Sequence, residues 1–133
     1  MPELPEVETC RRALEAELIG QQIGEYKHSA KRLREQAASS QMAELAGLTI
    51  NALERRAKYL IVRAQHEVIL IHLGMTGQLF MSDHSAPWLD HEHWRLELSN
   101  GWLRYRDPRR FGMLIRCSAA ELSSHPRIKD LGP

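Results

Sequence analysis

The sequence has little cysteine, with only Cys10 and Cys117 among 133 residues. Two cysteines are too few for a disulfide framework or a four-cysteine zinc site, and such low usage is typical of a reducing cytoplasm. Long apolar runs are also missing, because the hydrophobic stretches have only the length of a strand. The N-terminus is polar and acidic, unlike a secretory signal peptide. We therefore expect a cytoplasmic protein without a membrane partner.

A large excess of charge of either sign is absent, since the formal net charge is +1 at pH 7. This value alone does not indicate nucleic-acid binding, for which a strongly basic domain is usual. The charges are nevertheless segregated along the chain. The first 25 residues are rich in acids, residues 55–63 contain bases and no acid, and arginines crowd around Asp107 in residues 104–116. Such segregation can create one positive face, although a solvated surface is the default expectation for any charged run.

The length fits one compact domain with its own hydrophobic core. Residues 3–19 have the pattern of an amphipathic helix that ends at Gly20. Its apolar residues recur every three or four positions, at Val7, Cys10, Leu14 and Leu18. We interpret Cys10 as a packing residue on this stripe and not as a reactive thiol. Docking of the stripe on the core would hold the N-terminal amine in one place.

The rest of the chain has the pattern of short strands with brief connections. Strands are expected over residues 23–27, 48–56, 59–64, 68–73, 78–81, 93–98, 102–106 and 113–117, with a weaker candidate near Leu33. A short helix is predicted over 39–46, capped by serine and ended by Gly47. Asn100-Gly101 predicts a hairpin turn. The predicted fold is α+β and mainly β: an antiparallel β-sandwich flanked by helices, with a long helix at the N-terminus.

The first three residues carry a candidate catalytic group. If Met1 is removed, the nitrogen of Pro2 becomes a secondary amine that can attack an aldehyde-like sugar carbon and form an iminium. An α-amino group has a reference pKa of about 7.7 to 8.0, so a useful fraction is unprotonated near neutral pH. Proline and glutamate are also ordinary residues at a helix start. This stretch alone therefore does not separate catalysis from helix initiation.

Four longer motifs occur in a fixed order. They are PELPEVE at 2–8, RRAKYL at 55–60, HLGMTG at 72–77 and DPRRFG at 107–112, and the chain ends in LGP at 131–133. Together they closely resemble the N-terminal domain of bacterial formamidopyrimidine-DNA glycosylase, a family of base-excision enzymes that removes oxidised purines such as 8-oxoguanine. The resemblance covers essentially the whole chain and implies the same sandwich architecture.

The resemblance implies a DNA glycosylase with AP lyase activity. Pro2 would attack C1′ of the damaged nucleotide and displace the base, and Glu3 would manage protons at the sugar. Glu6 would lie one turn further along the helix as a supporting carboxylate. Lys58 would contact a phosphate and assist β-elimination, as a compact cation can. By pattern alone, Lys58 is a surface charge.

The resemblance also implies a set of DNA-probing residues on two turns. Arg109 would reach the base opposite the lesion, Phe111 would insert into the base stack, and Arg110 would contact the backbone. Met75 would fill the void left by the extruded nucleotide. Such a set is needed because C1′ of a stacked nucleotide is out of reach. By pattern alone, DPRRFG is a turn after a strand, and a lone methionine is more often core filler.

The sequence His91-Glu92-His93 raises the alternative of a metal site. The signal is weak, because no third and fourth ligand follow at a recognisable spacing. The resemblance instead implies that His91 binds a DNA phosphate and that His93 is structural. We interpret His72 as a structural histidine at a strand end. We expect no metal and no cofactor in this chain, because the zinc of the family belongs to a C-terminal finger.

The chain differs from the family in length. Complete members continue into a helical domain with a helix-two-turn-helix element and into a four-cysteine zinc finger. Residues 1–133 would thus be the catalytic N-terminal domain, with little or no activity when isolated, because half of the DNA clamp is missing. The related endonuclease VIII branch fits less well, since its members typically have glycine in place of Leu4 and lack the arginine-arginine-phenylalanine turn.

The expected partner is double-stranded DNA that contains oxidised purines or abasic sites, bound by a monomer at the bacterial nucleoid. Two other functions stay open at this point. The chain can be a truncated, inactive domain that binds DNA or a protein, or a structural sandwich whose arginines are merely solvated. Retention of Met1 would block the amine and favour binding without catalysis.

Overall fold

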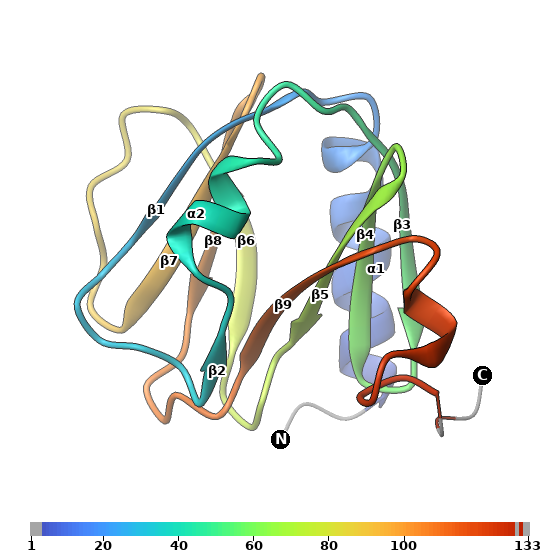
Figure 1. Ribbon diagram of the computed structural model, residues 1–133. Coiled ribbons are helices and arrows are strands. Elements are labelled where there is room, and N and C mark those ends of the chain that lie inside the picture. Colours follow the sequence, from blue (N-terminus) through green and yellow to red (C-terminus); the bar gives the residue numbers. More distant parts are fainter. Residues whose placement is uncertain (1–3, 130, 132–133) are drawn as a thin grey trace.

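Two β-sheets face each other across the core of the computed structural model, which describes residues 4–129 and 131 (Figure 1). The strands are β1 (Ile23–His28), β2 (Glu35–Gln36), β3 (Ile50–Arg56), β4 (Tyr59–Ala64), β5 (Glu67–His72), β6 (Gln78–Ser82), β7 (Glu92–Leu98), β8 (Gly101–Arg106) and β9 (Met113–Ser118). One sheet has the order β1-β7-β8-β6 and the other the order β2-β9-β5-β4-β3. The helices are α1 (Leu4–Leu18) and α2 (Ser39–Ala43), and a 3₁₀ turn, η1, spans Leu122–Ser124. The predicted sandwich is confirmed.

The strand predictions from residue 48 onward are confirmed to within two residues at each end. The weak candidate near Leu33 was misplaced, since the strand is β2, two residues further on. The sheets are antiparallel with one exception: β2 runs parallel to β9, pairing Glu35 with Met113. A strand of two residues has no alternating pattern, so neither its position nor its direction can be read from the sequence.

The predicted serine cap of the short helix is wrong. The backbone is still extended at Ala38, which is therefore the N-cap residue and has no side-chain acceptor. Instead, the amide oxygen of Gln41 reaches back and accepts a hydrogen bond from the Ala38 N–H at 3.3 Å. The helix also ends earlier than expected, at Ala43, and residues 44–47, which include Gly47, form turns.

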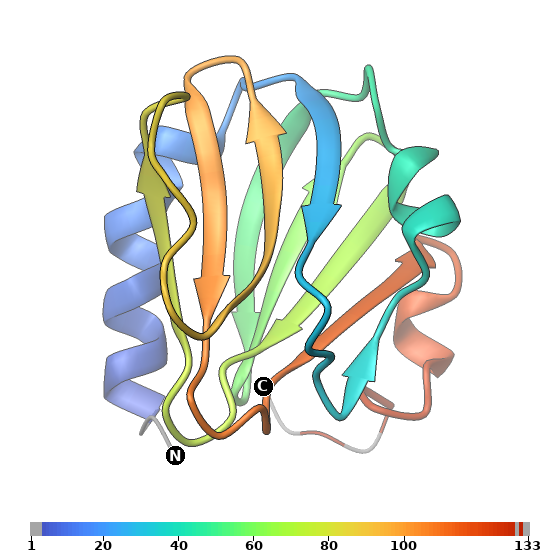
Figure 2. The same ribbon diagram turned by 90° about the vertical axis from the view of Figure 1, so that its left-hand side faces the viewer.

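Helix α1 closes one side of the sandwich, between the edge strands β3 and β6, and α2 lies at the opposite side (Figure 2). Val7, Leu14 and Leu18 of α1 are buried, as the apolar stripe predicted. The helix ends where Gly20 adopts φ of 89°, a left-handed conformation that glycine allows at little cost. No helix in residues 4–129 is long and apolar enough to cross a membrane.

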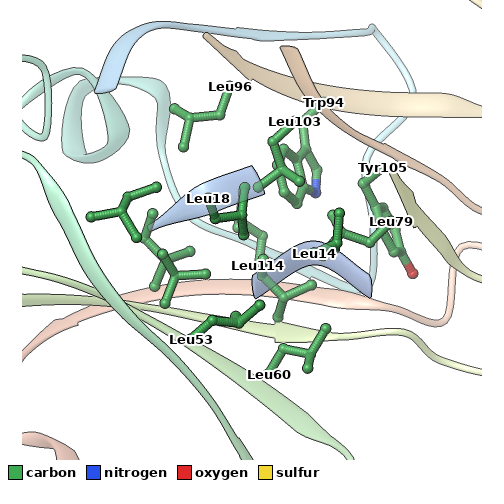
Figure 3. Close-up of a cluster of buried hydrophobic side chains, with 14 of the residues drawn as sticks. Leu14, Leu18, Leu53, Leu60, Leu79, Trp94, Leu96, Leu103, Tyr105 and Leu114 are labelled. Atoms are coloured by element: carbon green, nitrogen blue, oxygen red, sulfur yellow. The ribbon is translucent and has the colours of Figure 1, made fainter. Parts of the chain in front are cut away.

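The main core lies between the two sheets and α1 (Figure 3). The Trp94 and Tyr105 rings stack there at 5.7 Å between centroids. A second apolar cluster covers the outer face of the five-stranded sheet under the C-terminal segment. It contains Tyr59, Ile61, Val68, Leu70, Met113, Ile115, Cys117, Leu122 and Ile128. Both faces of this sheet are therefore buried, which explains the nearly continuous apolar runs in β4 and β5.

One edge of the sandwich gathers connections that are far apart in the sequence. We call it the loop edge. It consists of the start of α1, the loop 29–34, the β3–β4 turn at 57–58, the turn 73–77 and the turn 107–112, all at the bottom of Figures 1 and 2. The motifs singled out in the sequence therefore meet at one end of the molecule.

Candidate functional site

The turn 107–112 is built around the buried carboxylate of Asp107, directly after β8. Its Oδ2 atom accepts hydrogen bonds from the Tyr105 hydroxyl and the Gly112 N–H, both at 2.9 Å. Its Oδ1 atom accepts one from the Thr76 hydroxyl at 2.6 Å and one from the Arg109 N–H at 3.2 Å. One carboxylate therefore joins the turn 107–112 to the turn 73–77.

These four hydrogen bonds determine whether the Asp107 side chain is charged. Burial raises the pKa of Asp107, but the donors, led by Thr76 and Gly112, favour the carboxylate more strongly and hold its pKa below the ordinary value of 3.8. Asp107 is thus ionised at neutral pH and accepts four hydrogen bonds without facing solvent.

The two turns are also in backbone contact. Gly74 adopts φ of 64°, and a Cβ atom at this position would lie 2.7 Å from the nitrogen of Gly112. A Cβ atom on Gly77 or Gly112 would overlap the Tyr105 hydroxyl. Glycine is needed at these points because the turns approach each other and the tyrosine too closely for any side chain.

Two large apolar side chains project from these turns, although the chain buries most of its others. Met75 and Phe111 are each 40% exposed. The guanidinium carbon of Arg109 lies 5.0 Å from the centre of the Phe111 ring, a cation–π contact. Arg110, with φ of 58°, is exposed beside them. The structure therefore brings together the four residues predicted to probe DNA, and their individual roles stay predictions.

Lys58 follows Ala57, whose φ of 52° makes the tight β3–β4 turn. Arg55 braces this turn, because its guanidinium donates to the Ala57 carbonyl and to Oε1 of Glu8, each at 3.0 Å. Hydrogen bonds from Arg11 and Arg55 lower the pKa of Glu8 to about 2. The acid and the arginine thus connect α1 to the turn that carries Lys58.

His72 ends β5, and its Nδ1 atom accepts a hydrogen bond from the Gly74 N–H at 2.9 Å. Burial and the nearby positive charges of Arg34, Lys58 and Arg127 lower its pKa to about 4. The ring is therefore neutral at pH 7 and carries its proton on Nε2. His72 thus lies at the strand end, as expected, and its ring is hydrogen-bonded to the turn 73–77.

A pocket of about 410 Å³ opens beside the first turns of α1. It is lined by Glu6, Cys10, Leu73, Gly77, Gln78, Leu79 and Phe80. The Cys10 thiol points to the Leu79 carbonyl at 3.8 Å, and burial raises its pKa. Cys10 packs against the main core, as predicted, and the raised pKa disfavours the thiolate. Glu6 is exposed at the pocket; Pro2 and Glu3 lie outside the described residues, so their predicted roles stay predictions.

The three residues of the candidate metal motif separate in the structure. His91 is exposed before β7, with φ of 64°. His93 is buried, with Nε2 2.7 Å from the Asp107 carbonyl and Nδ1 3.1 Å from the Lys31 carbonyl. Glu92 points to Arg95 and Arg104 on the outer face of the four-stranded sheet. Within residues 4–129, no three His, Cys, Asp or Glu side chains gather as metal ligands.

Glu92 is fully buried on the outer face of the four-stranded sheet. It binds the Arg95 guanidinium at 2.9 Å and the Arg104 guanidinium at 2.5 Å. The two arginines also donate to the carbonyls of Ala86 and Pro87, which hold the β6–β7 loop on the sheet. This network fixes the chain that leads into His91.

Sequence reasoning missed Asp107 and Thr76 as the residues that organise the site. A signal for Asp107 exists, since it is the only acid in the arginine-rich stretch 104–116 and directly follows a predicted strand. Thr76 gives no such signal, because its partner lies 31 positions away in the sequence.

Comparisons with known proteins agree with this geometry. A family model, the formamidopyrimidine-DNA glycosylase N-terminal domain, matches residues 1–114. A formamidopyrimidine-DNA glycosylase of Stutzerimonas stutzeri is 43% identical over 134 residues, covering 100% of this chain and 49% of that protein. The chain therefore spans about half the length of this relative.

Solved structures give the same result. Lactococcus lactis Fpg in complex with DNA containing an oxidised pyrimidine has a TM-score of 0.86 at 34% identity, covering 93% of this chain and 47% of that one. The complex of the same protein with DNA containing an abasic site has a TM-score of 0.85 at 34% identity, covering 92% and 46%. By sequence and by fold, the chain belongs to the formamidopyrimidine-DNA glycosylase family, and residues 1–114 correspond to the N-terminal domain of that family.

Proposed function

We propose that this chain is the catalytic and DNA-probing module of a base-excision glycosylase with AP lyase activity, acting on 8-oxoguanine and formamidopyrimidines. One observation supports this proposal most directly. Four segments lie together at the loop edge: the start of α1, the Lys58 turn and the turns 73–77 and 107–112. A duplex that meets this edge meets the Lys58 turn and two probing turns, next to the first turn of the helix that follows the N-terminal residues. Its site of action is the bacterial nucleoid, where such DNA occurs.

The chemistry begins at the N-terminus. The free nitrogen of Pro2 attacks C1′, the glycosidic bond breaks, and the base leaves with the bonding electrons and takes up a proton. The attacking nitrogen loses its proton, which balances the proton that the base takes up, and Glu3 donates a proton to the ring oxygen as the sugar opens to the iminium. Removal of a proton from C2′ then expels the 3′ phosphate by β-elimination. Lys58 stabilises the departing phosphate, because a compact ammonium group pairs well with that charge.

Base extrusion explains the exposed apolar side chains. Unstacking a nucleotide costs a few kcal/mol, and side chains that fill the vacated space offset part of that cost. Met75 and Phe111 are suited to this, since each projects from a turn whose backbone is fixed. The pocket beside Glu6, with about 410 Å³, lies within the usual range for small-ligand sites and can receive the flipped nucleoside.

The relatives support an enzyme over a domain that binds without catalysis. The similar proteins are named formamidopyrimidine-DNA glycosylases, and Lactococcus lactis Fpg has been solved with DNA containing an abasic site, an oxidised pyrimidine or FAPY-dG. The chain spans about half the length of these proteins.

The test is borohydride trapping. The chain lacking Met1 is incubated with an 8-oxoguanine duplex, and separately with an abasic-site duplex, in the presence of sodium borohydride. We expect a covalent adduct whose mass and peptide map place the DNA remnant on Pro2. The matched control retains Met1, which blocks the amine and should abolish the adduct.

The outcomes separate the alternatives. A folded, Met1-free chain that binds both duplexes without forming an adduct would support the binding-only function. If the folded chain binds neither duplex, the structural role of the sandwich is the one hypothesis that remains.

A further inference from the structure

The arginines of this protein fall into two groups. Those on the sheet faces, along α1 and in the C-terminal segment are neutralised by acids: Arg11, Arg12 and Arg55 by Glu8, Arg63 by Glu54, Arg95 and Arg104 by Glu92, Arg116 by Glu44 and Glu67, and Arg127 by Glu35. In the described part of the chain, the arginines without a carboxylate partner are Arg32, Arg34, Arg56, Arg106, Arg109 and Arg110. All six lie in or directly beside the connections of the loop edge.

The loop 29–34 contributes two of these arginines, and its backbone is held in place. The Ser29 N–H donates to the His93 carbonyl at 2.9 Å, and the Lys31 carbonyl lies 3.1 Å from the His93 ring nitrogen Nδ1. Leu33 is buried in the main core. The loop is therefore anchored from within, while the side chains of Lys31, Arg32 and Arg34 are exposed.

The loop also adjoins the residues that the proposed function uses. The Arg34 N–H donates to the Arg110 carbonyl at 3.2 Å, which joins the loop to the turn 107–112. The charge of Arg34 acts on His72 together with that of Lys58. In Figure 2 the loop lies on the side of the probing turns opposite to the start of α1.

Asp107 and Glu35, the acids of the adjoining turn and strand, do not cancel this charge. Asp107 is buried with all its hydrogen bonds made inside the protein, and Glu35 is taken by Arg127 at 2.6 Å. Most arginines of the protein are paired with acids, but those of the anchored loop 29–34 are exposed and, among the described residues, unpaired. A group of unpaired arginines is suited to bind a densely charged polyanion. Duplex DNA carries about one negative charge per 1.7 Å of its axis.

We propose that Lys31, Arg32 and Arg34 bind backbone phosphates of duplex DNA and extend the contact surface beyond the probing turns. The inference rests on the proposed function, since it names a further contact of the same duplex. These side chains carry no base readout; they add affinity that is independent of sequence and sensitive to salt.

The test measures how salt weakens binding. Fluorescence anisotropy with a short abasic-site duplex gives the dissociation constant of the whole chain between about 50 and 200 mM salt. Each phosphate contact contributes about 0.9 to the slope of log K against log salt. Arg34→Ala should lower the slope by about that amount and weaken binding several-fold, and the double variant R32A/R34A should lower it about twice as much.

Arg34→Lys keeps the charge and should retain most of the slope. Arg63→Ala is the matched control, because it removes one positive charge near the far end of β4, away from the loop edge. If R34A and the double variant bind with the slope and affinity of R63A, the inference is wrong even when the wild type binds and forms the Pro2 adduct. A wild type that binds no duplex would overturn the proposed function as well.

Discussion

Replacing Asp107 by asparagine should loosen both probing turns at once. The carboxylate accepts four hydrogen bonds, two at each oxygen. Asparagine keeps one acceptor oxygen, but its NH₂ group must face a hydroxyl and a backbone N–H. The hydroxyl can rotate and accept, whereas the N–H cannot. At least one hydrogen bond is therefore lost, and the remaining ones lose the charge of the acceptor.

Hydrogen bonds to a charged group contribute about 1.5 to 3 kcal/mol each, so we expect Asp107→Asn to lower the free energy of unfolding by about 2 to 4 kcal/mol. Urea denaturation followed by circular dichroism measures this difference. Asp90→Asn is the matched control, because Asp90 is exposed and its replacement should change little. A D107N variant as stable as D90N would refute the role assigned to this carboxylate.

The same group predicts a dependence on pH. The folded pKa of Asp107 is depressed below 3.8, so its stabilising contribution is present above that value and is lost as the pH falls through the folded pKa. The stability difference between the wild type and D107N should therefore be constant near neutral pH and shrink below about 3.8. A difference that grows in acid would contradict this account.

Three further changes test other parts of the structure. Glu8→Gln should weaken the brace through Arg55, seen as faster amide hydrogen exchange in the β3–β4 turn, whereas Glu15→Gln on the same helix should not. Glu92→Gln leaves two buried guanidinium groups without a counter-charge and should cost about 3 to 5 kcal/mol in urea denaturation. Gly112→Ala forces a methyl group against a buried hydroxyl and should cost about 1 to 3 kcal/mol, with a lower thermal midpoint.

The sequence predicted most of the fold because most elements have a strong local pattern. The stripe of α1 repeats every three or four residues, and Asn100-Gly101 marks the β7–β8 turn, where Leu98 pairs with Gly101. The errors occur where pattern is absent. The strand β2 has two residues, and the cap of α2 depends on the extended backbone at Ala38. Both features depend on tertiary contacts and not on the local sequence pattern.

The candidate site was predicted in part. The motifs led to Lys58, Met75 and the turn 107–112, which the structure brings to one edge. The supports were not predicted, because the four donors around Asp107 come from two turns separated in sequence. The basic residues of the loop 29–34 were also overlooked, since an isolated charged loop looks like ordinary surface until its neighbours are known.

The shared carboxylate has a consequence for protein engineering. Thr76 and Gly112 belong to different segments, yet both hydrogen-bond to the side chain of Asp107. A chimera that takes only one of these segments from a homologue combines hydrogen-bond donors from two different proteins around one carboxylate. Shuffling experiments should therefore exchange 73–77 and 107–112 as a single cassette.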